Sequence, residues 1–269
     1  AKPRSIVEKV MAQPEVNYVE LGLQQSEQGQ FEQAIESFQK AVAQDPTSAD
    51  AQYNLGVAYG TIKKYQEAIP CFQEAIKMDH KFTDAIYNLG LIYGYLERND
   101  EAIEQFKNVI ALDATYAEAY YNLGGIYGAT GKNQEATATL EKAVEVNSTN
   151  PNAWINLGIA YGKSGDKTKA RQALENAVAL NPNSADAYYN LGLIYAGLEE
   201  YQKTKDSLKK VIEIDPNYTR AYYNLGIANG VLGEKEEAVK NLTRANELLK
   251  TANDPALINQ ISEAMKKLN

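Results

Sequence analysis

The sequence has few of the residues from which catalytic and metal centres are usually built. Its 269 residues contain one cysteine, Cys71, and one histidine, His80. A single cysteine excludes an internal disulfide framework and leaves the redox compartment open, and its apolar neighbours indicate a buried structural thiol. A single histidine with no other cysteine or histidine nearby is a poor metal ligand set, so we expect His80 on a surface loop. We therefore expect no metal, no cofactor and no catalytic residue, and we predict that the chain is not an enzyme.

Concentrated basic charge and long apolar runs are also missing. The formal net charge is −8, with acidic and basic residues interspersed, which excludes nucleic acid as the expected partner because phosphate binding needs a basic face. No apolar run approaches the roughly 18 residues that cross a bilayer, so we expect no membrane insertion. Residues 1–11 lack the long apolar core of a signal peptide. A signal removed earlier is compatible with this beginning, so the compartment stays open, with the cytoplasm slightly favoured over the periplasm or secretion.

What the sequence does contain is an internal repeat. The tripeptide Asn-Leu-Gly occurs six times at a step of 34 residues, and Leu21-Gly22 is a degenerate earlier copy. A period of this length is typical of a stacked array of repeats. With the glycine at position 8, the seven repeats are 15–48, 49–82, 83–116, 117–150, 151–184, 185–218 and 219–252.

Several other positions of the repeat are constant. Position 11 is Tyr in five repeats, position 20 is Ala in six, position 24 is Phe or Leu in all seven, and position 32 is Pro in three. This pattern resembles the tetratricopeptide repeat (TPR) family over about residues 15–252. Departures are local: Gln25 and Asn229 replace the tyrosine, and Thr204 replaces the alanine. The resemblance implies an all-α fold, a right-handed superhelical α-solenoid of helix-turn-helix repeats.

The spacing of the apolar positions predicts two amphipathic helices in each repeat. Positions 4, 7, 8 and 11 make the seam of the first helix, and positions 20, 24 and 27 make the seam of the second. Small residues at positions 8 and 20 allow the helices to approach, and large residues at 4, 11 and 24 fill the gaps between repeats. Expected helix stops and N-caps follow the same period: Gly29, Gly131, Gly165 and Gly233 as stops, Ser48, Asn150 and Ser184 as caps, and Pro151 at a first helical position.

The two ends are predicted to cover the open array. At the C-terminus, Asp254-Pro255 opens a capping helix within 253–269, with Leu257, Ile261, Ala264, Met265 and Leu268 on one stripe. At the N-terminus, residues 1–14 are predicted to form a half-unit or capping helix.

Candidate binding residues lie on the stripe of the first helix that its seam does not use, at positions 2, 5, 6, 9, 12 and 13. The TPR resemblance implies that this stripe lines the concave inner wall. Position 6 is an asparagine ladder suited to holding a peptide backbone, and it resembles the ladder in the TPR arm of peptide O-GlcNAc transferases. Alternatively, these amides bond to a neighbouring helix and fix the stacking. The predicted peptide-binding residues are Asn54, Asn88, Asn122, Asn156, Asn190, Asn224, Tyr53, Tyr87, Tyr121, Tyr189, Tyr223, Leu91, Ile159 and Leu193.

Two further rows on this stripe have alternative explanations. Position 12 is Gly in five repeats, which would give a groove with a low floor or, alternatively, would let adjacent first helices pack closely. Position 2 is mostly acidic, which suits the helix dipole and, if the row faces the groove, favours a basic ligand. Only Lys163 and Arg220 are basic on this stripe, so a clamp for a C-terminal carboxylate is disfavoured.

The leading hypothesis is a non-catalytic scaffold or adaptor that binds a peptide or helical segment of a partner protein in the concave groove. One alternative is a TPR scaffold that self-assembles, as a homo-oligomer through its ends, to organise a complex or coat. Another is the regulatory TPR arm of a larger enzyme. An RNA-reading array is disfavoured by the acidic charge.

Overall fold

The computed structural model describes residues 16–249 and 254–268, and within them the chain forms helices and no strands. The helices are α2 Tyr18–Glu27, α3 Phe31–Gln44, α4 Ala49–Thr61, α5 Tyr65–Met78, α6 Thr83–Tyr95, α7 Asn99–Leu112, α8 Ala117–Ala129, α9 Asn133–Val146, α10 Pro151–Lys163, α11 Lys167–Leu180, α12 Ala185–Gly197, α13 Tyr201–Ile214, α14 Thr219–Val231, α15 Lys235–Leu249 and α16 Pro255–Leu268. The all-α prediction is confirmed. The N-terminal half-unit predicted for residues 1–14 lies outside the described residues.

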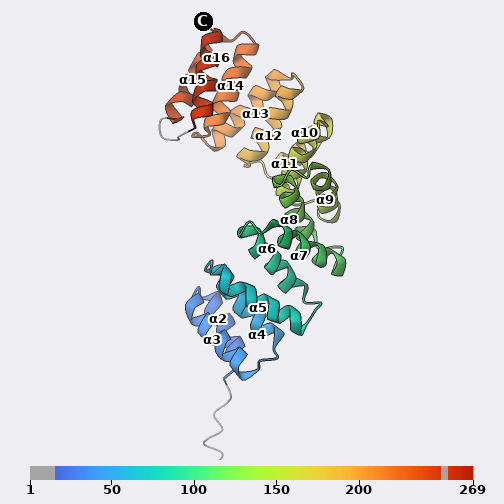
Figure 1. Cartoon of the computed structure of the whole chain (residues 1–269). Coiled ribbons are helices and arrows are strands. Elements are labelled where there is room, and N and C mark those ends of the chain that lie inside the picture. Colours follow the sequence, from blue (N-terminus) through green and yellow to red (C-terminus); the bar gives the residue numbers. More distant parts are fainter. Residues whose placement is uncertain (1–15, 250–253, 269) are drawn as a thin grey trace, which may run out of the picture. The chain divides into compact units, whose positions relative to one another are not determined.

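Each repeat is a helical hairpin (Figure 1), and hairpins stack on one another within each of two parts of the chain. The helix contacts divide the chain into two bodies at Ala119 and Tyr120. In the first body, each of the helices from α2 to α7 packs on the next, and the first helices α2, α4 and α6 also contact one another in order. In the second body the same pattern joins the helices from α9 to α16. Each body is therefore a stretch of α-solenoid, as the repeat predicted.

The close approach of the two helices in a hairpin depends on the glycine at position 8. A Cβ atom at Gly158 would lie 2.5 Å from the Cγ atom of Leu174, which is the position-24 residue of the same repeat. The same overlap occurs in the other repeats, from Gly22 against Phe38 to Gly226 against Leu242. Phe38 also packs in one cluster with Leu55 of the following repeat. Position 24 therefore fills the hairpin and the gap to its neighbour together.

One buried row of the first helix was not predicted. Position 3 is alanine in six repeats, and Ala51, Ala85, Ala119, Ala153, Ala187 and Ala221 are each 1% exposed or less. A small side chain at this place admits the neighbouring second helix. The row lies outside the predicted seam, which followed positions 4, 7, 8 and 11 of the first helix.

The predicted signals at the ends of the helices are confirmed. The Oγ atoms of Ser48 and Ser184 accept the N–H groups of Ala51 and Ala187 at 3.1 and 3.2 Å. Asn150 caps α10, and Pro151 occupies its first turn. Position 15 has positive φ in all seven repeats, including Lys63, Glu97 and Glu199, at 61°, 56° and 61°, where the other four repeats have glycine. Three repeats therefore carry strain at the turn between their helices.

The single cysteine and the single histidine lie where the sequence placed them. Cys71 is 7% exposed, and burial raises the pKa of its thiol to about 11, which agrees with a structural thiol. His80 is exposed in the loop after α5.

The stripe of α16 faces the last repeat. Leu257 and Ile261 are buried in one cluster with Leu242 and Leu249 of α15, and Ala264, Met265 and Leu268 pack against it. Asp254 accepts the N–H of Leu257 at 3.1 Å and so caps the helix.

The seventh repeat replaces the usual tyrosine at position 11 with a buried polar network. Asn229 is 2% exposed, and its side chain bonds to Glu234 and Asn241 at 2.5 and 3.1 Å. Lys205, from the preceding repeat, has only 8% of its side chain exposed and pairs with Glu234 at 2.5 Å. The bond from Lys205, followed by that from Asn229, lowers the pKa of Glu234. This network joins repeats six and seven by charge instead of by an aromatic ring.

Replacing Glu97 by glycine should stabilise the fold by about 0.5–1 kcal/mol, because glycine adopts the left-handed conformation without a Cβ clash. The midpoint of urea unfolding measures this change. Gly131→Ala, at the same position of the next repeat, is the matched control and should lower the midpoint. A Glu97→Gly midpoint at or below that of the unaltered protein would contradict the strain.

The network around Glu234 should make stability depend on pH. A lowered pKa in the folded state means that the contribution is complete above the ordinary glutamate pKa of about 4.3 and is lost as pH falls through the lowered value. Glu234→Gln should therefore be less stable than the unaltered protein at pH 7, and the difference should shrink between about pH 5 and 3. Urea midpoints across this range test it, with Glu247→Gln, an exposed carboxylate of α15, as the control with little effect at any pH.

Candidate peptide-binding face

The first-helix face, which consists of positions 2, 5, 6, 9, 12 and 13 of each repeat, remains accessible in both bodies. The six asparagines of position 6 are all half-buried. Position 9 reaches solvent, and Leu193 and Ile227 are 38% and 37% exposed. The amides and phenols are therefore not sealed between neighbouring repeats, as they would be if they served the stacking alone.

The asparagine side chains are held by their nitrogen atoms. The Nδ2 atoms of Asn54, Asn88, Asn190 and Asn224 donate to the carbonyl oxygen four residues earlier, at 2.8–2.9 Å. A carbonyl oxygen can only accept a hydrogen bond, so the NH₂ group must be the part that faces it. Asn224 also donates to the hydroxyl of Tyr189 in the preceding repeat at 3.1 Å, and Asn88 lies 3.5 Å from the hydroxyl of Tyr53. The amide nitrogens of Asn88 and Asn224 therefore contact the preceding repeat, as the stacking alternative expects, whereas those of Asn54 and Asn190 bond only their own helix.

The oxygen half of the ladder is not used in the same way. No described residue donates a hydrogen bond to the Oδ1 atom of Asn54, Asn88, Asn190 or Asn224. In Asn88 and Asn224 both amide hydrogens point into the protein, one to a backbone carbonyl and one to a tyrosine hydroxyl. The group that remains for a further hydrogen bond is the amide oxygen, which is an acceptor. These four asparagines, in repeats two, three, six and seven, therefore present carbonyl-type oxygens on the first-helix face.

The tyrosines of position 5 lie on the first-helix face and also contact aromatic residues where neighbouring repeats pack. Tyr53 stacks obliquely on Phe82 at 4.8 Å, and Tyr189 stacks on Tyr218 at 4.9 Å. Burial raises the pKa of Tyr53 and of Tyr189, so both remain neutral phenols that accept from the asparagines. These rings orient the ladder in addition to any contact that they make with a ligand.

The aromatic partners at position 34 were missed in the sequence. They are Phe82, Tyr116 and Tyr218. Tyr116 and Tyr218 lie in hydrogen-bond range of the position-2 carboxylates Asp84 and Asp186, at 3.3 and 3.4 Å. Burial, followed by the nearby Asp186, raises the pKa of Tyr218 to about 12. Position 34 is aromatic in only some of the repeats, so the periodicity of the sequence did not identify it.

A small hollow opens on this face of the second body, between α8 and α10. Its volume is about 190 Å³. Position 9 is Gly125 here instead of the aliphatic residue of other repeats, and Gly128 supplies the low floor at position 12. Asn156 and Ile159 form the facing wall. The Nζ atom of Lys163 closes one side with a 3.4 Å contact to the carbonyl oxygen of Gly128.

The glycine row of position 12 has no single explanation. A Cβ atom at Gly162 would lie 3.1 Å from the Cδ1 atom of Ile194 in the next first helix, which supports the packing alternative there. At Gly128 the nearest atom would be 4.0 Å away, at Ala136. The low floor at Gly128 is therefore available to a ligand.

The charged groups exposed on this face are mainly carboxylates, which accept hydrogen bonds, and not cations. Asp50, Asp84 and Asp186 are exposed at position 2. The two basic residues are engaged: Arg220 pairs with Asp254 at 3.1 Å, and Lys163 contacts Gly128.

Two absences apply to the described part of the chain. None of the helices within 16–249 and 254–268 has the length and apolar character needed to span a membrane. The same stretches contain no group of three or more His, Cys, Asp or Glu side chains that could hold a metal ion.

Gly128→Ala should stabilise the protein by up to about 1 kcal/mol, because alanine is the better helix former and its methyl group meets no close neighbour. Gly162→Ala should gain less or lose stability, because Ile194 must move. Thermal unfolding of the two variants side by side measures the difference, and a lower melting temperature for Gly128→Ala than for Gly162→Ala would show that the floor is a packing contact.

Comparison with known proteins agrees with this geometry. The family described as TPR repeat matches residues 22–62, 95–131, 126–165 and 163–199. Two further tetratricopeptide-repeat families match residues 49–82 and 185–218, and residues 219–248. No curated protein matches the chain at a significant level.

Among solved structures, MamA is 34% identical, with a TM-score of 0.59, over 62% of this chain and 92% of its own. YrrB, described as a TPR protein with an unusual peptide-binding site, is 24% identical, with a TM-score of 0.62, over 71% of this chain and 97% of its own. PilF of Pseudomonas aeruginosa is 17% identical, with a TM-score of 0.68, over 82% and 99%. The last two similarities concern the fold alone.

The matched repeats cover more than half of the sequence, and the helical hairpins show the packing that the repeat pattern predicts. The chain belongs to the tetratricopeptide repeat family.

Proposed function

We propose that this protein is a non-catalytic interaction scaffold whose first-helix face binds an extended, basic segment of a partner protein. Membership of the TPR family and similarity to MamA support the general class of interaction scaffold. The observation that carries the finer proposal is the orientation of Asn54, Asn88, Asn190 and Asn224, whose amide nitrogens bond inside the protein and whose amide oxygens remain as acceptors.

Acceptors of two kinds are neighbours on this face. The acidic residue at position 2 and the asparagine at position 6 are four residues apart, and residues at this spacing lie on the same side of a helix. Asp186 and Asn190 are an example on α12. A ligand that supplies hydrogen-bond donors satisfies both rows: the N–H groups of an extended backbone meet the amide oxygens, and lysine or arginine side chains meet the carboxylates.

The aliphatic row beside the ladder supplies apolar contact. Leu91, Ile159, Leu193 and Ile227 stand at position 9, and the last two are more than one third exposed. Apolar area of this kind contributes roughly 25 cal/mol per Å² when a ligand covers it. The tyrosines, which are already oriented by aromatic neighbours, add contact at little cost in side-chain entropy.

The ladder can be tested with peptides selected on the intact protein from a random dodecapeptide phage library. We expect selected peptides to be rich in lysine and arginine. In Asn190→Ala/Asn224→Ala, the dissociation constant of a selected synthetic peptide should rise by roughly ten- to a hundredfold. The reason is that each of the two lost hydrogen bonds between neutral groups contributes about 0.5–1.5 kcal/mol. Isothermal titration calorimetry measures the constant, and circular dichroism checks that helicity is retained.

The matched control is Gln66→Ala/Gln134→Ala, which removes two exposed amides from second helices, α5 and α9. Its affinity should equal that of the unaltered protein. Equal affinity in the Asn190→Ala/Asn224→Ala protein would defeat the ladder as a binding element, and a selection dominated by acidic peptides would defeat the basic ligand.

A further inference from the structure

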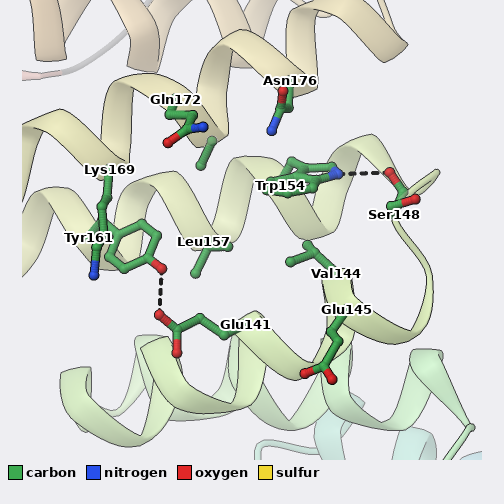
Figure 2. Close-up of a pocket in the computed structure, with 11 residues that line it drawn as sticks. Glu141, Val144, Glu145, Ser148, Trp154, Leu157, Tyr161, Lys169, Gln172 and Asn176 are labelled. Carbon is green, nitrogen blue, oxygen red and sulfur yellow. Dashed lines mark hydrogen bonds between the residues drawn. The ribbon is translucent and has the colours of Figure 1, made fainter.

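A second hollow lies away from the first-helix face, on the side where second helices meet. It has a volume of about 490 Å³ and opens between α9, α10 and α11 (Figure 2). Val144, Leu157 and Ala173 give it an apolar floor, and the rings of Trp154 and Tyr161 stand on α10. We call it the tryptophan groove. Its volume is typical of sites that bind side chains or small ligands.

Trp154 is the one tryptophan of the chain, and its ring is fixed in place. It occupies position 4, where four other repeats carry tyrosine. Its Nε1 atom donates to the carbonyl oxygen of Ser148 at 2.8 Å. Because the polar edge of the indole is held by the backbone, the ring cannot fold into the hollow and fill it. A half-buried aromatic face is thus kept beside open space.

The charges at the two ends of the groove differ. At one end, the hydroxyl of Tyr161 donates to Glu141 at 2.5 Å, and the Nζ atom of Lys169 lies 5.4 Å from the centre of the Tyr161 ring. The acid and the cation of that end are therefore already engaged with the same ring. Figure 2 shows Trp154 and Glu145 toward the opposite end of the groove, on separate helices with Val144 between them, and in this view the carboxylate of Glu145 is directed away from the indole ring.

Glu145 is available for a new partner. Its present one is Lys142 on the same helix, at 2.6 Å, and the two side chains are 65% and 57% exposed. An ion pair this exposed contributes little to stability, so its loss costs little when a better partner arrives. The tryptophan end therefore combines an indole face, which is the strongest aromatic partner for a cation, with a carboxylate that is readily re-paired.

We propose that the tryptophan groove binds an arginine side chain of a partner protein, with the guanidinium stacked on Trp154 and paired with Glu145. Arginine fits this pair of groups better than lysine, because its planar guanidinium stacks on a ring and bonds both oxygens of a carboxylate at once. Apolar residues beside the arginine cover Val144 and Leu157. The amides of Gln172 and Asn176, which line the wall formed by α11, bond to the peptide backbone.

The same groove two repeats later lacks this chemistry and serves as an internal comparison. Between repeats six and seven the hollow is about 520 Å³. There Tyr222 takes the place of Trp154, and Lys209 takes the place of Glu141 at position 25. Tyrosine is a weaker partner for a cation than tryptophan, and Lys209 places positive charge where the tryptophan groove has Glu141, so we assign arginine binding to the tryptophan groove alone of these two.

The single tryptophan makes the groove directly observable by intrinsic fluorescence. The probe is the tripeptide acetyl-Leu-Arg-Leu-amide, compared with acetyl-Leu-citrulline-Leu-amide, which has the same shape and no charge. We expect a saturable change in tryptophan emission with the arginine peptide, and a roughly tenfold weaker response to the citrulline peptide, because the cation–π contact and the ion pair are lost together.

Variants separate the groove from general attraction to an acidic protein. Glu145→Gln should weaken the arginine peptide about tenfold. Glu213→Gln removes the same position-29 carboxylate, with the same kind of lysine pair, from repeat six, and should leave binding unchanged. Trp154→Tyr, which restores the usual residue of position 4, should fold and should bind more weakly by calorimetry.

Three results would overturn the proposal: no saturable change in fluorescence, equal binding of the arginine and citrulline peptides, or equal losses in Glu145→Gln and Glu213→Gln. The Asn190→Ala/Asn224→Ala protein should keep the full fluorescence response. The proposals for the tryptophan groove and for the first-helix face can therefore be contradicted independently of one another.

Discussion

The contact between the glycine of position 8 and the large residue of position 24 is the constraint on which the whole array depends. With no Cβ at position 8, the second helix comes close enough for a phenylalanine or leucine to lie directly on the backbone of the first. This contact fixes the hairpin, and it also brings the position-24 side chain to the edge where the next repeat packs. Two faces of every first helix are thereby used, one inside the hairpin and one between hairpins. The stripe that remains is the first-helix face.

Stacking and binding are not separate uses of that face, because single side chains serve both. Asn88 and Asn224 use the amide nitrogen to bond their own helix and the tyrosine of the preceding repeat. These bonds leave the amide oxygen exposed, and the proposed ligand is therefore one that donates hydrogen bonds. The position-5 tyrosine is similarly divided, since its ring packs between repeats and its hydroxyl accepts from the ladder. The contacts that stack the repeats thus also orient the side chains of the proposed binding face.

Residues that depart from the repeat pattern give individual repeats their own local structure. Gly125 opens a small hollow on the first-helix face, Trp154 borders a larger one between second helices, and Asn229 replaces a tyrosine contact by a charged network. Each change alters one residue of the pattern while the hairpin remains. The repeat supplies the scaffold, and the exceptions supply local chemistry that a uniform array cannot have.

The sequence by itself determined the number of repeats, the two helices of each and the residues of the seam, because a 34-residue period and helical spacing are properties of the chain alone. It also determined the first-helix face, as the stripe that the seam leaves over. Only the tertiary structure decided how the amides of Asn88 and Asn224 are oriented, because both hydrogens are placed by partners that include a hydroxyl 35 residues away. It alone revealed the buried alanines of position 3 and the aromatic partners of position 34, whose roles follow from contact with neighbouring helices. The tryptophan groove, too, depends on three helices from two repeats meeting around Trp154, and distances between separate segments are not written in the pattern of any one of them.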